Sequence, residues 1–355
     1  MEDRGGPALG WALIGCGGAG RSHARGAAET PGVAVRAFCD VRLPAALRLQ
    51  AEYGGRATDD PAQVFADPEV DVVSIATTHD THTGLALAAF AAGKHVFLEK
   101  PMAMSTAECL QIAAAQRAAG RQLLLNFSFR FSGALREVKR RLPRPLVSHA
   151  QCLMAAADLS RWRWDPVAGG GPLWDVGVHT ADLLCWLHGG PPVEVFATGG
   201  QITHAGRLAS PDLIDTAAAT LRFADGAVAT FLVSDAGFNP FASKWLFESF
   251  DGQRSAVVYD HGRTVAFGGP ADPGGAPPEA ATLSPPPLAR FPVLLDAIRD
   301  GGESYAPAAA GIVATLVVEH IIAAVRSGQP QRVVLPPELR AEAPVAGALP
   351  VHPHP

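Results

Sequence analysis

Asp175 and His179 are two titratable residues in an otherwise apolar stretch, GGGPLWDVGVHTAD, which spans residues 169–182 and begins with three glycines. If the stretch is helical, positions i and i+4 project from one face, so the two side chains share the same space. An imidazole can accept a proton, while the carboxylate either orients the imidazole or grips the same ligand. A carboxylate at a helix N-terminus plus a hydrogen-bonded core histidine is the alternative explanation.

A third candidate, Lys100, lies in the segment HVFLEKPMA. It follows a short apolar run typical of a parallel strand, and ligands bind at the carboxyl edge of such sheets. There an ammonium can donate to a substrate oxygen as negative charge develops. A lysine after a strand is by default a solvated cap, but Pro101 restricts the backbone beside it and thereby aims the side chain.

A glycine-rich turn supplies the second kind of chemistry, phosphate binding. The segment ALIGCGGAG contains G-x-G-x-x-G between an apolar run and a potential helix. The first glycine allows a tight turn, the second lets the backbone approach a pyrophosphate, and the third allows close packing of helix on strand. We expect a dinucleotide to contact Gly15, Cys16, Gly17, Gly18, Ala19 and Gly20.

Asp40 ends the next apolar run, 20 residues after Gly20. A carboxylate at this place accepts hydrogen bonds from the adenosine ribose hydroxyls. Its charge would repel a 2′-phosphate, so we expect NAD rather than NADP. Arg42, two residues further on, could soften that exclusion.

The elements that must position these residues follow two patterns. From Trp11 to about Asn126, short apolar runs alternate with alanine-rich helical stretches, which predicts a parallel sheet with helices on both faces. After Phe127, Ala-Asp-Gly at 224–226 and Asp-Gly at 251–252 separate strand-like runs, which indicates serial hairpins. The fold class is therefore α/β, with a doubly wound parallel sheet followed by an α+β part whose sheet is open and mostly antiparallel.

Several segments together resemble the glucose–fructose oxidoreductase/inositol dehydrogenase/rhizopine-catabolism (Gfo/Idh/MocA) family. The resemblance covers about Leu9 to Leu335 and depends on the order and spacing of GCGGAGRSHA, DPEVDVVSIAT, AAGKHVFLEKPMA, NFSFRF and GGGPLWDVGVHTAD. It implies an N-terminal Rossmann domain and a C-terminal domain whose open sheet carries the substrate pocket. It also implies oxidation of a secondary hydroxyl of a sugar or cyclitol, or the reverse reduction.

The resemblance also implies roles for individual residues. Lys100, Asp175 and His179 are the expected catalytic residues, and Glu99–Lys100–Pro101 matches the family's catalytic motif, with a cis proline as one possibility. His82 matches a family histidine near the nicotinamide ribose, although helix capping explains it equally well. The remaining expected cofactor contacts are Thr77, Glu99 and Asn126, and the expected substrate contacts are Arg130 and Trp162.

Trp162 could stack on a sugar face, but core or interface packing is the competing explanation. The family commonly has a proline where this chain has Thr78, so the local turn here is not fixed by the resemblance. We expect the NAD(P)-binding domain at 1–127, the substrate domain at 128–335 and a flexible tail at 336–355. The Pro/Gly-rich stretch 269–289 is expected to be a long loop.

Composition narrows the classes of partner. The net charge of −5 argues against a nucleic-acid partner, and no uninterrupted apolar run of about 18 residues predicts a membrane span. The five scattered cysteines form no CxxC pair, so we expect neither a metal site nor disulfides, and we expect a cytoplasmic protein. We see no signal peptide.

The expected function is an NAD(P)-dependent oxidoreductase acting on a small polyol or sugar. Two other functions remain open: a hydrolase or lyase that retains NAD and uses transient oxidation, and a non-catalytic dinucleotide-binding regulator. The presence of Lys100, Asp175 and His179 argues against the regulator, since a sensor needs no proton relay. By resemblance to the family, the open sheet face suggests a homo-oligomer.

Overall fold

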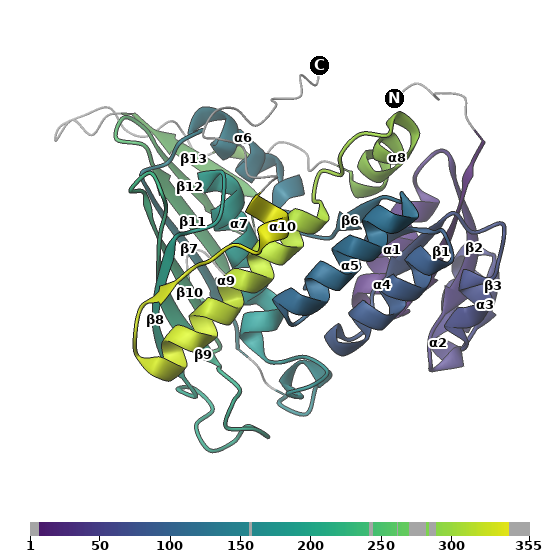
Figure 1. Cartoon of the computed structure of the whole chain (residues 1–355), viewed down its shortest axis with the longest axis horizontal. Coiled ribbons are helices and arrows are strands. Elements are labelled where there is room, and N and C mark those ends of the chain that lie inside the picture. Colours follow the sequence, from purple (N-terminus) through teal and green to yellow (C-terminus); the bar gives the residue numbers. More distant parts are fainter. Residues whose placement is uncertain are drawn as a thin grey trace.

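The computed structural model describes residues 7–155, 158–240, 244–260, 262–269, 282–283 and 289–340. Within these residues the chain builds two sheets (Figure 1). The first sheet is formed by the N-terminal third of the chain and the second by the part after residue 146. The predicted α/β fold class is confirmed.

The first sheet has the order β3-β2-β1-β4-β5-β6 among the described strands, and every neighbouring pair is parallel. Its strands are β1 (Leu9–Ile14), β2 (Val33–Cys39), β3 (Arg56–Thr58), β4 (Val72–Ile75), β5 (His95–Leu98) and β6 (Leu123–Leu125). The chain reverses direction across the sheet between β1 and β4. Such a switch point leaves a crevice at the carboxyl ends of these strands, where dinucleotides bind.

Helices connect these strands as the alanine-rich stretches predict. They are α1 (Gly18–Ala28), α2 (Leu43–Tyr53), α3 (Pro61–Phe65), α4 (His82–Ala91) and α5 (Thr106–Ala119). Ser105 caps α5 by accepting a hydrogen bond from the Glu108 backbone N–H, and Asp60 caps α3. In contrast, no side chain caps α1, which begins directly after the glycine-rich turn.

The second sheet has the order β14-β13-β12-β11-β7-β10-β9-β8-β15 among the described strands. Only the central pair β7–β10 is parallel in that set, so the prediction of a mostly antiparallel sheet is confirmed. Its strands are β7 (Val147–Leu153), β8 (Glu194–Gly200), β9 (Thr216–Arg222), β10 (Val228–Ser234), β11 (Trp245–Phe250), β12 (Ser255–Tyr259), β13 (Thr264–Gly268), β14 (Thr282–Leu283) and β15 (Gln331–Arg332).

Both predicted hairpins are present in the second sheet. β9 pairs antiparallel with β10 across the turn that contains Gly226, and β11 pairs with β12 across the turn that contains Gly252. Both glycines have positive φ angles, 91° and 87°, which a residue with a Cβ adopts only at a cost. Side chains on β9 alternate between buried and exposed, as expected for a sheet with one covered face.

The helices of the second part are α6 (Gly133–Arg141), α7 (Val178–His188), α8 (Arg290–Asp300), α9 (Ala308–Ser327) and α10 (Pro337–Arg340). Helix α9 runs between the second sheet and α5 and contacts α7, β8 and α5 (Figure 1). It is long and apolar enough to cross a membrane by length and composition alone, but most of it is buried inside the structure. Helix α9 is therefore packed between neighbouring elements of the described chain.

Helix α8 returns to the first sheet although it lies late in the sequence. Phe291 packs edge-on against Trp11 of β1 at 5.8 Å and against Phe97 of β5 at 5.2 Å between ring centroids. The Trp11 indole also donates to Ser74 Oγ at 2.7 Å, so its one polar atom is satisfied. The first core is therefore completed by residues that follow β14 of the second sheet in the sequence.

Two segments differ from expectation or lie outside the described residues. Within the tail expected to be flexible from residue 336, residues 337–340 form α10, and Leu339 is 7% exposed against the core. Residues 341–355 lie outside the described residues. So do 270–281 and 284–288, which make up most of the loop expected at 269–289, while Thr282–Leu283 form β14 against β13.

Gly311 of α9 lies against Leu125 of β6 and against Met102. A Cβ there would lie 2.6 Å from both the Met102 sulfur and Leu125 Cδ1, and 2.8 Å from Met102 Cβ. We predict that Gly311→Ala lowers the free energy of unfolding by about 1–3 kcal/mol through overpacking, despite the better helix propensity of alanine. Urea unfolding followed by tryptophan fluorescence measures the change.

Gly84→Ala is the matched control, because a methyl group added to this helical glycine of α4 would have nothing within 4 Å of it. That variant should gain up to about 1 kcal/mol from helix propensity. Equal effects of the two substitutions would mean that α9 does not pack on Met102 and Leu125 as described.

His188, at the end of α7, makes stability depend on pH. Its ring stacks on Phe223 at 4.1 Å and its Nε2 contacts Ser148 Oγ, and burial lowers the pKa of His188 to about 4. Between pH 6.5 and 4 the unfolded chain binds a proton that the folded chain does not, so stability falls as pH falls through this window. His188→Gln should remove about 2 kcal/mol of that loss.

Urea unfolding at pH 7.5 and at pH 5 measures this difference. His149→Gln on the exposed side of β7 is the control, since it removes a histidine without changing a buried ring. If the two variants lose the same stability between the two pH values, His188 is not the buried neutral group that the structure indicates.

Candidate active site at the junction of the two sheets

The glycine-rich turn between β1 and α1 leaves its outer side open. Gly15 has a φ of 96°, and a Cβ at Gly20 would lie 1.9 Å from the Gly15 carbonyl oxygen, so both positions require glycine. By contrast, Gly17 and Gly18 have nothing within 4 Å of a Cβ position. The free backbone N–H groups of the uncapped α1 N-terminus therefore face open space, which fits a dinucleotide pyrophosphate.

Asp40, after β2, fixes this turn. Its Oδ2 accepts from the Cys16 backbone N–H at 2.8 Å and its Oδ1 accepts from the Arg42 backbone N–H at 2.9 Å. The Arg42 side chain is 75% exposed, with Nε 3.7 Å from Asp40 Oδ1. The carboxylate thus lies beside the glycine turn, as adenosine ribose binding requires. Burial, followed by Asp40, raises the pKa of the Cys16 thiol to about 12, so this thiol stays protonated.

Glu99 belongs to a buried polar cluster behind Lys100. Its Oε1 contacts His23 Nε2 at 3.0 Å and accepts from the Asn126 side-chain amide. Burial opposes ionisation of Glu99, but the hydrogen bond and charge of His23, together with Lys100, lower the pKa of Glu99 to about 2. His23 Nδ1 and Asn126 Oδ1 are buried without a hydrogen-bond partner. This cluster anchors the segment that carries Lys100.

Lys100 bridges the two parts of the molecule. Its Nζ lies 2.8 Å from Asp175 Oδ1 and also donates to the Asp175 backbone carbonyl. Both side chains are 13% exposed. Burial alone would raise the pKa of Asp175, but the charges of Lys100 and Arg163 hold it well below its usual range. The following Lys100–Pro101 peptide is cis, as the family resemblance suggested.

The three glycines before Asp175 fold the chain back on itself. A Cβ at Gly169 would lie 2.4 Å from Arg163 Cα, and the Gly171 N–H donates to the Arg163 carbonyl at 2.9 Å. Gly170 and Gly171 have positive φ angles of 69° and 84°. The absence of side chains at these glycines therefore lets the turn pack closely on the backbone of Arg163. It brings Arg163 Nη1 to 3.5 Å from Asp175 Oδ2.

Asp175 lies in a π-helical turn, Leu173–Gly177, which continues into α7. Wider turns of this kind are frequently found at functional sites. Although Asp175 and His179 are four residues apart, the Asp175 carboxylate binds Lys100 and Arg163 rather than the imidazole. The structure therefore does not show the carboxylate orienting the histidine, one of the two roles expected from the spacing.

His179 lies among aromatic rings at the start of α7. Its centroid is 5.5 Å from Phe129, 6.1 Å from Phe127 and 6.4 Å from Trp245. Burial, followed by the charge of Lys100, lowers the pKa of His179 to about 3, so the ring is neutral at physiological pH. Nδ1 is buried without a partner while the residue as a whole is partly exposed. The accessible edge of a neutral imidazole can accept a proton.

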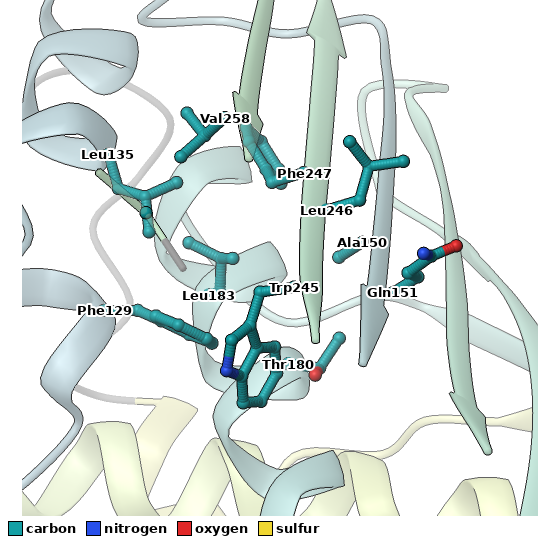
Figure 2. Close-up of a pocket in the computed structure, with 11 residues that line it drawn as sticks. Phe129, Leu135, Ala150, Gln151, Thr180, Leu183, Trp245, Leu246, Phe247 and Val258 are labelled. Atoms are coloured by element: carbon teal, nitrogen blue, oxygen red, sulfur yellow. The ribbon is translucent and has the colours of Figure 1, made fainter. Parts of the chain in front are cut away.

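Two cavities adjoin these residues. Figure 2 shows the first, where Phe129 and Trp245 lie against each other beside Thr180 and Leu183 of α7. Its volume of about 20 Å³ accommodates no more than a water molecule. The second has a volume of about 150 Å³ and is lined by Met154, Ala155, Arg163, Asp235, Phe238 and Lys244. Because Arg163 also approaches Asp175, this larger cavity lies next to the Lys100–Asp175 pair.

The other predicted cofactor residues lie along the carboxyl ends of β4 and β5. Thr77 follows β4, and its Oγ1 accepts from Thr81 Oγ1 at 2.6 Å. His82 is fully buried, with Nδ1 2.7 Å from the Pro101 carbonyl, and burial lowers the pKa of His82. Its observed contact therefore holds the Lys100 segment. Cofactor contacts of these residues stay predictions.

The two predicted substrate residues differ in how they are engaged. The Arg130 guanidinium binds the buried Asp182 carboxylate through Nε at 3.0 Å and Nη2 at 2.7 Å. In the structure the Arg130 guanidinium is therefore bound to α7, and contact of Arg130 with substrate stays a prediction. Trp162 is 39% exposed and packs edge-on against His79 at 4.8 Å. Stacking of Trp162 on a sugar also stays a prediction.

The sequence did not indicate the contacts that two histidines, His79 and His23, and one lysine, Lys244, make around the site. The His79 N–H donates to the Ala168 carbonyl at 2.9 Å and its Nδ1 lies 2.9 Å from the Gly169 carbonyl, so it ties the glycine segment to the first sheet. His23 lies three residues after Gly20 on α1, a spacing that points it at the sheet. Lys244 carried no sequence signal. Among the described residues, no group of three His, Cys, Asp or Glu could hold a metal ion.

Comparisons with known proteins identify the family of the chain. The model of an oxidoreductase family with an NAD-binding Rossmann fold matches residues 9–127, and that of the GFO/IDH/MocA C-terminal domain matches residues 133–257. The chain is 31% identical to 1,5-anhydro-D-fructose reductase of Ensifer adhaerens over 62% of this chain and 68% of that protein. It is 34% identical to inositol 2-dehydrogenase of Acidothermus cellulolyticus over 61% of this chain and 63% of that protein.

Solved structures extend the likeness of fold to nearly the whole chain. Levoglucosan dehydrogenase in complex with NADH and L-sorbose has a TM-score of 0.83 at 21% identity, with 92% of this chain and 99% of that chain covered. The family matches include both the glycine-rich turn and the Asp175–His179 segment. The chain therefore belongs to the Gfo/Idh/MocA family of oxidoreductases, with an NAD-binding Rossmann fold in its N-terminal part.

Proposed function

We propose that this protein is an NAD-dependent oxidoreductase that transfers hydride between the nicotinamide and a secondary alcohol or ketone of a sugar, cyclitol or sugar derivative. The observation that carries the proposal is the Lys100–Asp175 ion pair beside a neutral His179. It joins a lysine after a Rossmann strand to a carboxylate on the helix of the second part. The relatives named as an anhydrofructose reductase and an inositol dehydrogenase support the substrate class.

The three residues divide the work of alcohol oxidation. His179 accepts the hydroxyl proton on its accessible edge, because its imidazole is neutral and its Nδ1 is buried. The Lys100 ammonium stabilises the oxygen as negative charge develops on it. Asp175 holds that ammonium in place through its carboxylate and its carbonyl. The larger cavity beside Arg163 gives the remainder of the substrate room.

Bound NAD would supply the hydride acceptor. The α1 N-terminus with Gly17 and Gly18 would hold its pyrophosphate, and Asp40 would hold the adenosine ribose. The Glu99 cluster keeps the Lys100 segment fixed from behind, since Glu99 remains ionised and bound to His23 and Asn126. Aromatic rings pack around His179, and its Nδ1 is buried away from solvent.

His179→Ala should reduce turnover by about 10²–10⁴-fold, the usual contribution of a positioned general base. NAD binding should be retained, because no residue of the glycine-rich turn is changed. Initial rates of NADH formation with a panel of inositols and aldoses measure the first effect, and calorimetric titration with NAD measures the second.

His149→Ala is the control for this experiment, since His149 lies on β7 and contacts Thr230 away from the site. Unchanged turnover in His179→Ala would remove His179 from the mechanism. If no substrate releases NADH in bulk while products still form, the protein is instead a hydrolase or lyase that retains its cofactor.

Asp40→Ser should shift the cofactor preference from NAD toward NADP. The substitution removes the charge that would repel a 2′-phosphate and leaves the exposed Arg42 beside the vacated space. We expect the ratio of kcat/KM with NAD to that with NADP to fall about 10- to 100-fold, since a hydrogen bond to a charged group is lost.

Asp59→Ser is the control, because Asp59 is an exposed acid at the end of β3. The same ratio in wild type and Asp40→Ser would mean that Asp40 only ties the glycine-rich turn through Cys16. A parallel measurement of the unfolding temperature separates that structural effect from recognition of the ribose.

A further inference from the structure

Two cationic side chains line the larger cavity next to the Lys100–Asp175 pair, and the protein does not fully satisfy their charges and hydrogen-bond donors. Arg163 and Lys244 both contribute to its wall, and its volume of about 150 Å³ is several times that of one water molecule. The mechanism proposed above gives neither side chain a role. Burying a positive charge costs free energy unless the charge is paired. A cavity lined by two such groups is therefore expected to bind a ligand that carries negative charge.

The Arg163 guanidinium is only partly satisfied. Its Nη1 lies 3.5 Å from Asp175 Oδ2, longer than a normal hydrogen bond, and its Nε is buried without a partner. The glycine turn fixes this position, since Gly171 N–H binds the Arg163 carbonyl and Gly169 packs on its backbone. Arg163 therefore presents donors to the cavity from a rigid segment.

Lys244 is still less engaged. Its backbone carbonyl accepts from the Leu153 N–H at 2.9 Å, and the residue lies directly before β11. Its Nζ lies over the Trp245 ring at 5.1 Å from the centroid, and among the described residues no carboxylate lies within 4 Å of it. The ammonium thus faces the cavity with a ring beneath it and no counter-ion from that part of the chain.

The charges around the cavity leave one positive charge over. Asp235 also lines it, but its Oδ2 is bound to His204 Nε2 at 2.5 Å, so this carboxylate already has a partner. Lys100 and Asp175 neutralise each other. The charged residues in the cavity wall are the cations Arg163 and Lys244 and the carboxylate Asp235, so the wall has a net charge of one positive unit. This charge matches a singly charged anion better than a neutral sugar or a dianionic phosphate.

We propose that the substrate is a sugar acid, whose carboxylate binds between Arg163 and Lys244 while the reacting carbinol carbon lies at Lys100 and His179. This inference rests on the proposed function and narrows its substrate class. The carboxylate takes no part in the reaction: the carbinol carbon gives its hydride to NAD, the hydroxyl proton passes to His179, and a ketone forms. Arg163 connects the reacting end of the site with the carboxylate end, because it approaches Asp175 and also lines the cavity.

Paired substrates that differ only in charge test the proposal. Glucose and glucuronate, galactose and galacturonate, and glucose 6-phosphate are compared by initial NADH formation with NAD in excess. We expect kcat/KM for the uronates to exceed that for the neutral sugars by about 10- to 100-fold, the range for a charge-assisted hydrogen bond. Equal use of the neutral sugars, or a preference for the phosphate, would overturn the proposal.

Variants at Lys244 locate the effect. Lys244→Met keeps the stem over Trp245 and removes the charge, so it should lower kcat/KM for uronates about tenfold or more and reduce the difference within each pair. Lys244→Arg should restore the difference. Arg222→Met removes a cation from the exposed face of β9 and serves as the control. A loss as large in Arg222→Met as in Lys244→Met would also overturn the assignment.

Failure of this inference and failure of the proposed function give different results. Turnover of neutral sugars or inositols without preference for acids leaves the oxidoreductase assignment intact and removes the sugar acid. If no member of the panel is turned over, calorimetric titration of the NAD-saturated protein with each pair still decides. Tighter binding of the uronate, lost in Lys244→Met, supports the carboxylate site, whereas equal affinities refute it.

Discussion

The ion pair between Lys100 and Asp175 is the contact on which the site depends. It connects the carboxyl end of β5 to the helix of the second part, and it is almost completely removed from water. Pairs of this kind gain little net stability, because desolvation offsets their attraction, but losing one partner is costly. The pair is thus better understood as a constraint on position: neither the amine nor the carboxylate can move without the other.

Several neighbouring contacts enforce the same constraint from both sides. His82 holds the Pro101 carbonyl, and His79 holds the carbonyls of Ala168 and Gly169. Burial and nearby positive charge keep His79 neutral, with a pKa of about 3, so these bonds do not titrate at physiological pH. A reaction that needs an amine and an imidazole at one carbon atom benefits from a frame that does not loosen as pH changes.

The sequence was sufficient for the parts of the fold that follow local rules. Apolar strands, alanine-rich helices and the turns at Gly226 and Gly252 were predicted, because each is determined by residues next to one another. The return of α8 to the first sheet was not, since it depends on Phe291 meeting Trp11 from the opposite end of the chain. Local patterns contain no signal for such a contact.

The candidate site divides in the same way. The types and order of Lys100, Asp175 and His179 indicated their proximity, yet the partner of each side chain was not predictable. Helical spacing left open whether Asp175 orients His179 or both grip one substrate, and in the structure the Asp175 carboxylate binds Lys100. Arg163 and Lys244 come together only through the second sheet and the glycine turn, so their shared cavity had no counterpart in the sequence.

The late return of α8 has a consequence for how the chain is made. During synthesis the Rossmann strands leave the ribosome long before Phe291, so Trp11 and Phe97 lack one wall of their core until most strands of the second sheet have emerged. The nascent N-terminal part therefore leaves the aromatic surface of Trp11 and Phe97 exposed until Phe291 is synthesised. The two parts then complete their cores together rather than one after the other.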